Sequence, residues 1–438
     1  MPTSTRNTVL LERSRTAVWH PCTQMKQHET LPIVPIARAQ GCWLYDCDGK
    51  RYLDAVSSWW VNLFGHGNAR IKAAINAQLD QLEHVILAGF THEPVVALSE
   101  QLTALTGLGH CFYASDGASA TEIALKMSFH YWQYTGRTGK TQFISLQQGY
   151  HGETLGALSV TDVPLFKQAY APLLRPSAQM PSPDGRLAAP GETAEAYALR
   201  CADALEAYCT AHHAEIAAFI VEPLVQCAAG MAMYDPVYLR RARAICDRYD
   251  IHLIADEIAV GFGRTGTLFA CEQAGIRPDL LCLSKGITGG YLPLSVTLCS
   301  EAIYQAFYDD DTARGFLHSH SYTGNALACS AALATLAIFE QDDVLTVNRE
   351  KAAYMNRRLN ALAQLPITGL RNTGMIWAFE VATQQAQFSR RFYEAGLARG
   401  LLLRPIGNTV YFMPPYVIDE PEMDWLVEQT AQLITEWA

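Results

Sequence analysis

The chain has 438 residues, of which 50% are hydrophobic and 17% are charged. This length is more than one hydrophobic core usually supports, so we expect two domains that share an interface. A formal net charge of −10, with no run of Lys or Arg interleaved with aromatic residues, argues against a nucleic-acid partner. No unbroken apolar stretch reaches roughly twenty residues, so we expect a soluble, cytoplasmic protein with no membrane partner.

The cysteine and histidine patterns favour neither a disulfide framework nor a metal site. Twelve cysteines spread from Cys22 to Cys329 without a CxxC pair, which is typical of reduced thiols. We expect no metal at His212-His213 or at His318-Ser319-His320.

The N-terminal part predicts a small β element followed by helices. Residues 42–54 read as two strands joined by an Asp48-Gly49 turn, a strong hairpin signal. Residues 69–82 and 94–106 carry apolar positions at helical spacing. These segments are expected to lead into a larger domain.

Residues 110–300 alternate short apolar runs with helical patterns, which indicates a doubly wound α/β domain. The runs have no period-2 alternation, as expected for strands of a buried parallel sheet. Residues 176–195 are rich in Pro, Gly, Ser and Ala and are expected to form a surface loop.

The C-terminal part returns to α+β patterning. Residues 326–339 predict a long helix that carries the chain out of the large domain, and strands are expected at 374–380 and 410–413. We therefore expect a discontinuous small domain formed by residues 1–66 and 333–438, with the large domain at 67–332.

Three of the buried runs end in ionisable residues, namely Glu222, Asp256 and Lys285. Ligands of parallel sheets bind beyond the carboxyl ends of the strands, so these side chains are expected in one crevice. An acid and a lysine at such a site suggest a Schiff-base lysine and the partner of a pyridinium nitrogen, which is pyridoxal phosphate chemistry. The alternatives are a solvated lysine and, for Asp256, a helix N-cap.

Other residues are candidates for holding the cofactor. Gly117, Ala118 and Ser119 form a turn that opens an expected helix at 120–132, and their amides would bind a phosphate there, although the same turn suits an ordinary cap. Tyr150 and Ile258 are candidates for covering the two faces of a planar ring. Ser321 offers a further hydroxyl for the phosphate.

Two features suggest a substrate pocket. Arg404 follows an apolar strand and is expected to bind a substrate carboxylate in bidentate fashion, with a structural ion pair as the alternative. Trp59 and Trp60 cannot both face one interior in an extended segment, so one is expected to line a cleft.

The run 254–266 together with Lys285 resembles the class III aminotransferases of the fold-type I pyridoxal phosphate superfamily, from about Trp19 to the C-terminus. The motifs that most resemble the biotin-pathway branch are Trp19-His20-Pro21, Ser57-Ser58-Trp59-Trp60, Gly89-Phe90-Thr91-His92, Gly149-Tyr150-His151-Gly152-Glu153 and Leu403-Arg404-Pro405. The resemblance implies a mostly parallel seven-stranded sheet in the large domain and a homodimer with the cofactor near the subunit interface.

The resemblance also implies roles for individual residues. Lys285 would bind pyridoxal 5′-phosphate covalently and Asp256 would contact its ring nitrogen. The other implied cofactor contacts are Gly117, Ala118, Ser119, Tyr150, His151, Glu222, Ile258 and Ser321, the last expected from the neighbouring subunit. The implied substrate contacts are Trp59, Tyr150, Arg264, Lys285, Ser319, Arg404 and Tyr411.

For the substrates, the resemblance implies 8-amino-7-oxononanoate as amino acceptor and S-adenosylmethionine as donor. Cys22 departs from the pattern, because it stands where the best-known members carry a tyrosine that contacts the substrates. A lysine donor, used by a minority of relatives, therefore stays as an alternative. Another ω-aminotransferase or an aminomutase would keep the cofactor residues, but neither should favour the aromatic residues Trp59 and Trp60. A non-catalytic cofactor-binding regulator is disfavoured because Lys285 is present and no DNA-binding module is appended.

Overall fold

The computed structural model describes residues 5–437, which divide into two compact units. Unit 1 consists of residues 5–68, Glu350–Leu370 and 377–437, and unit 2 consists of Ala69–Arg349 and Arg371–Ile376. The chain leaves unit 2 within helix α12 (Val344–Leu359). It returns to unit 2 for residues Arg371–Ile376, which begin within strand β13 (Ile367–Thr373). The boundary thus lies at Arg349 rather than at residue 332, because helix α11 (Ala326–Gln341) belongs to unit 2.

Unit 2 is built on a seven-stranded sheet in the order β4-β12-β11-β10-β7-β5-β6. The strands are β4 (His110–Ala114), β5 (Gln142–Leu146), β6 (Ala178–Met180), β7 (Ile216–Val221), β10 (His252–Asp256), β11 (Leu280–Leu283) and β12 (Ser295–Cys299). Only the pairings made by β12 are antiparallel. The predicted mostly parallel α/β fold is confirmed.

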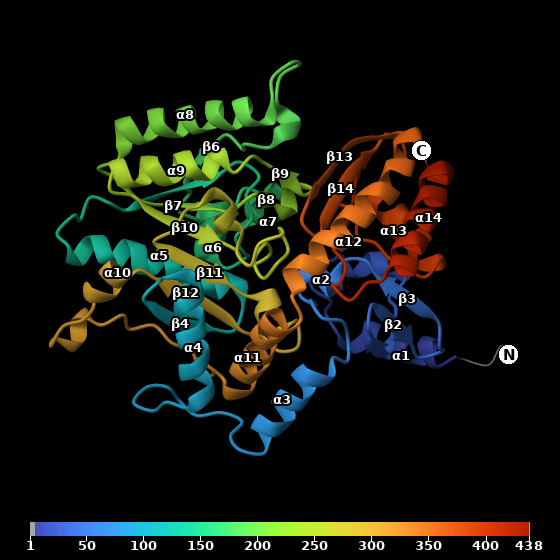
Figure 1. Ribbon diagram of the computed structural model, residues 1–438, viewed down its shortest axis with the longest axis horizontal. Helices are drawn as coiled ribbons and strands as arrows, with labels where there is room; N and C mark the ends of the chain where they lie inside the picture. The colour runs from blue at the N-terminus through green and yellow to red at the C-terminus, as the bar shows by residue number, and fades with distance from the viewer. Residues whose placement is uncertain (1–4, 438) are drawn as a thin grey trace. The chain divides into compact units, whose positions relative to one another are not determined.

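Helices cover both faces of this sheet, as Figure 1 shows. Alternate residues of β7 separate the two faces: Ala218 and Ile220 join a core with helix α5 (Gly117–Tyr134), whereas Phe219 meets Tyr238 of helix α9 (Val237–Arg248). Helix α8 (Ala194–His212) packs beside α9. Both faces of the strands are therefore buried, which explains why their sequences are uniformly apolar.

Short elements complete unit 2. The helices are α3 (Ala69–Leu79), α4 (Glu93–Thr106), α6 (Leu155–Val160), α7 (Pro164–Lys167) and α10 (Glu301–Gln305). A small hairpin pairs β8 (Val225–Gln226) with β9 (Ala232–Met233). The 3-10 helices are η2 (Gln168–Leu173), η3 (Gly185–Leu187), η4 (Cys227–Ala229), η5 (Ala270–Ala274), η6 (Lys285–Thr288) and η7 (Thr312–Arg314).

Two local expectations are corrected. The stretch 176–195 is not only loop, because it contains β6, the edge strand of the sheet, and the turn of η3. Its three residues, Ala178-Gln179-Met180, are too few and too polar to give a strand pattern. Helix α5 starts at Gly117 rather than at residue 120, because Asp116 caps it.

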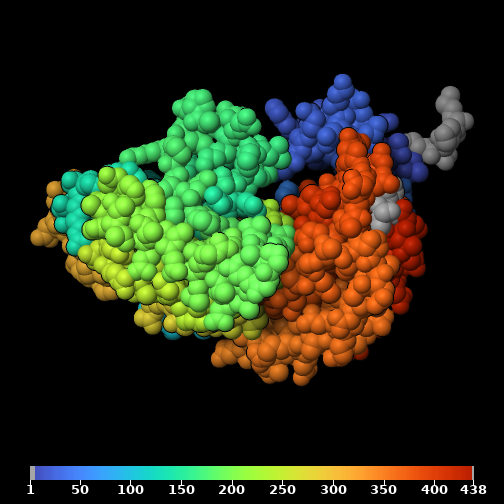
Figure 2. Space-filling model, turned by 90° about the horizontal axis from the view of Figure 1, so that it is seen from above, coloured from blue at the N-terminus to red at the C-terminus, as the bar shows by residue number. Residues whose placement is uncertain are grey.

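Unit 1 is built from both ends of the chain. One sheet has the order β1-β2-β3-β15, in which β15 (Leu401–Leu402) pairs in parallel with β3 (Arg51–Asp54). Strands β2 (Trp43–Asp46) and β3 form the expected hairpin. In Figure 2 the blue N-terminal surface lies beside the orange and red C-terminal surface of this unit.

The other elements of unit 1 surround these strands. The remaining strands are β1 (Ile36–Gln40) and, from the sheet β13-β14-β16, the antiparallel pair β14 (Ile376–Val381) and β16 (Thr409–Phe412). The helices are α1 (Arg6–Ala17), α2 (Ser57–Trp60), α13 (Phe388–Ala398) and α14 (Glu420–Trp437), with 3-10 turns η1 (Met25–Glu29) and η8 (Asn360–Gln364). Within residues 5–437, no helix is long and apolar enough to cross a membrane.

Candidate active site

The three ionisable strand ends of unit 2 lie at one edge of the sheet. Strand β10 is central, with β7 on one side and β11 on the other, both parallel to it. Glu222 follows β7, Asp256 ends β10, and Lys285 begins η6, two residues after β11. The topology therefore brings the predicted acids and lysine together at the carboxyl ends of neighbouring strands.

Asp256 is buried and held from two sides. Its Oδ2 atom lies 2.7 Å from Nδ1 of His151, and its Oδ1 atom accepts a hydrogen bond from the amide of Ile258 at 3.1 Å. The side chain of His151 is 1% exposed, so water does not compete for this contact. Because turns over residues 258–265 rather than a helix follow Asp256, the helix-cap alternative for this residue is wrong.

Glu222 is a buried carboxyl group with two backbone donors. The amides of Tyr150 and Cys227 donate to its two oxygens at 3.0 and 3.1 Å. Burial raises the pKa of Glu222 to about 7, and the neighbouring Asp256 acts in the same direction, while His151 opposes both. Glu222 thus holds the Tyr150 segment beside Asp256.

Lys285 occupies a strained and desolvated position. Its φ angle is 45°, in the left-handed region that few residues without a glycine's freedom adopt. Burial lowers the pKa of its amine, and this effect is opposed by Cys227, Asp256 and Glu222. An amine with a lowered pKa is more often neutral and therefore nucleophilic.

Arg264 belongs to the same buried region. Arg264 is 1% exposed, and its carbonyl oxygen accepts a hydrogen bond from the amide of Met375 at 2.8 Å. Burial raises the pKa of the Cys227 thiol, whereas the charges of Lys285 and Arg264 oppose this rise. Both cations therefore act electrostatically on Cys227.

The start of α5 offers an anion site. The first amides of a helix have no carbonyl partner within it, so Gly117 and Ala118 present N–H groups at the positive end of the helix dipole. In this structure Ser119 is already engaged, since its amide and hydroxyl donate to the two oxygens of Asp116 at 3.0 and 2.8 Å. The role of Ser119 in phosphate binding stays a prediction.

Glycines bring the loops of the site close to that helix. A Cβ atom on Gly152, whose φ is 120°, would lie 2.6 Å from Cβ of Ala118. A Cβ atom on Gly117 would lie 2.9 Å from the side chain of Ile258. The His151 loop, the Asp256 loop and the start of α5 therefore enclose one region, and a side chain at either glycine would displace them.

Tyr150 and the serines of the 318–323 loop are less engaged with this cluster. The Tyr150 hydroxyl donates to Glu153 at 3.0 Å, and its ring meets Phe166 edge-on with centroids 5.9 Å apart. Ser319 and Ser321 are exposed, and the carbonyl oxygen of Ser321 lies 2.6 Å from Nε2 of His84. Their proposed cofactor and substrate contacts stay predictions.

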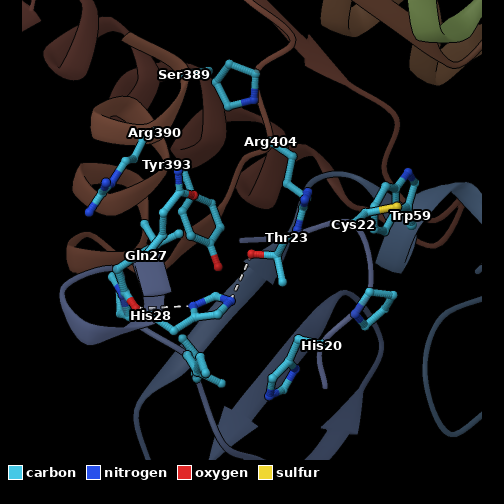
Figure 3. Close-up of a pocket in the computed structure, with 16 residues that line it drawn as sticks. His20, Cys22, Thr23, Gln27, His28, Trp59, Ser389, Arg390, Tyr393 and Arg404 are labelled. Carbon is cyan, nitrogen blue, oxygen red and sulfur yellow. Dashed lines mark hydrogen bonds between the residues drawn. The ribbon is translucent and has the colours of Figure 1, made fainter. Parts of the chain in front are cut away.

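Unit 1 contains a cavity of about 390 Å³ beside Arg404. The guanidinium carbon of Arg404 lies 4.5 Å from the ring centroid of Trp59, and Figure 3 shows both side chains at the cavity with Cys22 and Tyr393. No acidic residue lines the cavity, and among residues 5–437 Arg404 forms no ion pair. The structural ion-pair alternative for Arg404 is therefore wrong.

Trp59 reaches this cavity through an unusual turn. All four residues of α2 have left-handed φ angles, namely 50° for Ser57, 48° for Ser58, and 73° for Trp59 and Trp60. Each such residue costs roughly 1–2 kcal/mol relative to the right-handed form. Trp59 is 42% exposed, whereas Trp60 is buried and its Nε1 atom donates to the Tyr411 hydroxyl at 3.1 Å.

Comparison with known proteins identifies the family. The model of the family described as Aminotransferase class-III matches residues 23–434. The chain belongs to the class-III aminotransferases. It is 47% identical to the adenosylmethionine-8-amino-7-oxononanoate aminotransferase of Helicobacter pylori over 427 residues, which covers 96% of each chain.

Solved structures of this family have the same fold. The chain superimposes on the adenosylmethionine-8-amino-7-oxononanoate aminotransferase of Methanocaldococcus jannaschii with a TM-score of 0.92 at 36% identity, covering 98% of this chain and 99% of that one. A PLP-bound amine transaminase from an uncultivated Pseudomonas species gives a TM-score of 0.90 at 32% identity, covering 96% and 99%. The fold-type I assignment is confirmed.

Pyridoxal 5′-phosphate (PLP) is the cofactor of this aminotransferase, and the residues of unit 2 fit its groups. The desolvated amine of Lys285 suits its aldehyde, the buried carboxyl group of Asp256 suits its ring nitrogen, and the amides at the start of α5 suit its phosphate. His151 contacts Asp256, and its predicted contact with the cofactor stays a prediction. No sequence pattern indicates the pairing of His151 with Asp256. None indicates that Asp54 lies beside the left-handed turn of α2.

Proposed function

We propose that this aminotransferase transfers an amino group from S-adenosylmethionine to 8-amino-7-oxononanoate, producing 7,8-diaminononanoate for biotin synthesis. The names of the relatives at 36–47% identity support this choice of substrates. The observation that carries the proposal is Arg404, a cation without an ion-pair partner among residues 5–437, which lines a cavity free of acidic side chains. Such a guanidinium suits the carboxylate of the acceptor.

Lys285 is proposed as the catalytic residue for proton movement. When bound, PLP supplies an electron sink that makes the Cα proton of an attached amine acidic. The buried amine of Lys285, kept partly neutral by desolvation, takes that proton from the donor and delivers one to the former carbonyl carbon of the acceptor. The left-handed backbone at Lys285 directs its side chain from the strand end into the site.

The other site residues are proposed to bind and orient. Asp256, held by His151, keeps the ring nitrogen protonated, and Gly117, Ala118 and Ser119 hold the phosphate. The remaining cofactor contacts proposed are Tyr150, Glu222, Ile258 and Ser321. Trp59, Tyr150, Arg264, Ser319 and Tyr411 are proposed to contact the substrates.

Arg404 is proposed to bind the carboxylate with the edge of its guanidinium, since Trp59 covers one face. Stacking leaves the in-plane N–H groups available, and these are the donors that pair with a carboxylate. The aromatic lining also suits the apolar chain of the acceptor.

The donor is the less constrained part of the proposal. Cys22 lines the same cavity as Trp59 and Arg404, and a thiol is a weaker hydrogen-bond donor than the phenol of the family pattern. Lysine as donor is the alternative that this substitution keeps open. We also propose a cytoplasmic homodimer, and twelve cysteines that form no disulfide among residues 5–437 fit a reducing compartment.

A donor panel tests the function. Purified protein is incubated with PLP and 8-amino-7-oxononanoate, and S-adenosylmethionine, lysine, alanine and glutamate are offered separately while diaminononanoate is measured. We expect product with S-adenosylmethionine and none from the Lys285→Ala variant. Product with lysine alone would make lysine the donor, and the absence of product with every one of the four donors would refute the proposed substrates.

A further inference from the structure

The left-handed turn of α2 is held by the carboxyl group of Asp54, the last residue of β3. Oδ1 of Asp54 accepts hydrogen bonds from the amides of Ser58 at 2.9 Å and Val56 at 3.3 Å. Oδ2 accepts from the Ser58 hydroxyl at 2.7 Å and lies 3.2 Å from Nε2 of His66. Asp54 is fully buried, whereas its partner Ser58 lies at the surface and the side chain of His66 is 19% exposed.

Further bonds anchor both sides of the turn within unit 1. The Ser57 hydroxyl donates to the carbonyl oxygen of Met413 at 2.7 Å. The amide of Trp60 donates to the carbonyl oxygen of Val56 at 2.8 Å, which closes the turn. Four consecutive left-handed residues without a glycine persist only where the surroundings hold them, and Asp54 supplies contacts at the centre of the turn.

The direction of the turn decides where Trp59 points. With left-handed backbone, Trp59 reaches the cavity under the Arg404 guanidinium while Trp60 packs inward against Tyr411, with ring centroids 6.2 Å apart. Relaxation to a right-handed turn would redirect the Cα–Cβ bonds of both residues. Trp59 would then no longer cover one face of Arg404, and the plane of the guanidinium would be free to rotate.

We propose that Asp54 is a positioning residue for substrate carboxylate binding, because it locks the left-handed turn that places Trp59 against Arg404. This inference rests on the proposed role of Arg404 in binding the acceptor carboxylate. Asp54 does not itself touch substrate; it acts through Ser58 and Trp59. Its loss should therefore weaken acceptor binding through the carboxylate.

The test compares Asp54→Asn with Asp46→Asn in the PLP-loaded enzyme. Asp46 is a matched control because it is another buried aspartate of the same sheet, and it accepts bonds from the amides of Asp48 and Lys50, from the Asn7 side chain and from the Tyr52 hydroxyl. We expect Asp54→Asn to raise the acceptor KM about tenfold or more. Asp46→Asn should lower thermal stability without changing the acceptor KM.

A double-mutant cycle decides whether Asp54 acts through Arg404. If it does, Asp54→Asn combined with Arg404→Gln should raise the acceptor KM no more than Arg404→Gln alone. The methyl ester of the acceptor, which lacks the carboxylate, should show no added defect with Asp54→Asn. Additive effects in the cycle, or an equal loss with the ester, would overturn the inference.

Two outcomes are kept apart by these measurements. If Arg404→Gln leaves the acceptor KM unchanged, the proposed function of Arg404 fails. If Arg404→Gln raises the acceptor KM but Asp54→Asn leaves it unchanged, only the positioning role of Asp54 fails. Should Asp54→Asn not fold, Ser58→Ala removes one of the four contacts and is expected to raise the acceptor KM by about threefold. An unchanged KM in Ser58→Ala would then overturn the inference.

Discussion

His151 and Asp256 form a buried pair at the centre of the sheet edge, with Nδ1 of His151 2.7 Å from Oδ2 of Asp256. The amide of His151 also donates to the Thr161 hydroxyl at 3.0 Å, which fixes the backbone of the loop. A carboxyl group that pairs with the ring nitrogen of PLP must keep one orientation, and this histidine restricts its rotation. We therefore propose that the histidine supports the cofactor through Asp256.

We predict that His151→Ala weakens PLP binding by about 10- to 100-fold, because it removes a hydrogen bond to a charged group that is worth about 1.5–3 kcal/mol. The dissociation constant is measured by titrating the cofactor-free protein and following absorbance. His213→Ala is the control, since His213 is exposed and its ring contacts Tyr249 away from the strand ends. Unchanged affinity in His151→Ala would contradict the supporting role.

A glycine pair separates backbone strain from steric displacement at the phosphate site. Gly152→Ala places a Cβ atom 2.6 Å from Cβ of Ala118, whereas Gly191→Ala meets no atom within 4 Å, although both glycines have positive φ. Gly191→Ala should cost only the strain, roughly 1–2 kcal/mol of unfolding free energy. We predict that Gly152→Ala costs more and also weakens PLP binding at least severalfold, as measured by denaturation and cofactor titration.

Much of unit 2 is predictable because its strands are buried on both faces and end in chemistry-bearing residues. The apolar runs before Glu222, Asp256 and Lys285 specify three adjacent strands, and the sheet order then brings their ends together. The edge strand β6 escapes prediction, since three residues carry no period. Pairings between distant residues, such as His151 with Asp256, depend on tertiary structure and leave no local pattern.

The left-handed turn is unpredictable for a different reason. Ser57-Ser58-Trp59-Trp60 contains no glycine or asparagine, the residues that usually mark positive φ. Its conformation is imposed by Asp54 and by the Met413 carbonyl. Met413 is distant in sequence, and Asp54 cannot be distinguished in the sequence from an ordinary strand residue. The sequence indicates a special site only through two adjacent tryptophans that one interior cannot accommodate.

The buried carboxyl of Glu222 makes the stability of the cofactor-free protein depend on pH. Because its pKa rises from 4.5 to about 7 on folding, the folded state retains a proton that the unfolded state loses in this range. The contribution of Glu222 to the free energy of unfolding is thus full below pH 4.5. It is lost as the pH rises through 7, which lowers stability by about 3 kcal/mol. Glu257, whose pKa is also raised to about 7 by burial, acts in the same direction.

Chemical denaturation at pH 5, 6, 7 and 8 measures this dependence. We predict that Glu222→Gln is less stable overall, because an amide NH₂ group would face a backbone donor, but that its stability falls less steeply with pH. A slope equal to that of the unmodified protein would show that Glu222 does not titrate in this window.

Arg404 and Arg390 provide a matched comparison at one cavity. Both line it, but Arg390 is engaged, with its Nε atom 3.2 Å from Glu394 and a second nitrogen donating to Thr30 at 2.6 Å. Arg404 lies against Trp59 without an ion-pair partner among residues 5–437, so a carboxylate ligand would be its counter-charge. We predict that Arg404→Gln weakens acceptor binding by about 2–5 kcal/mol, whereas Arg390→Gln changes it little. Steady-state acceptor KM values for both variants measure the difference, and an equal loss in the two would show that the cavity acts only through its overall positive charge.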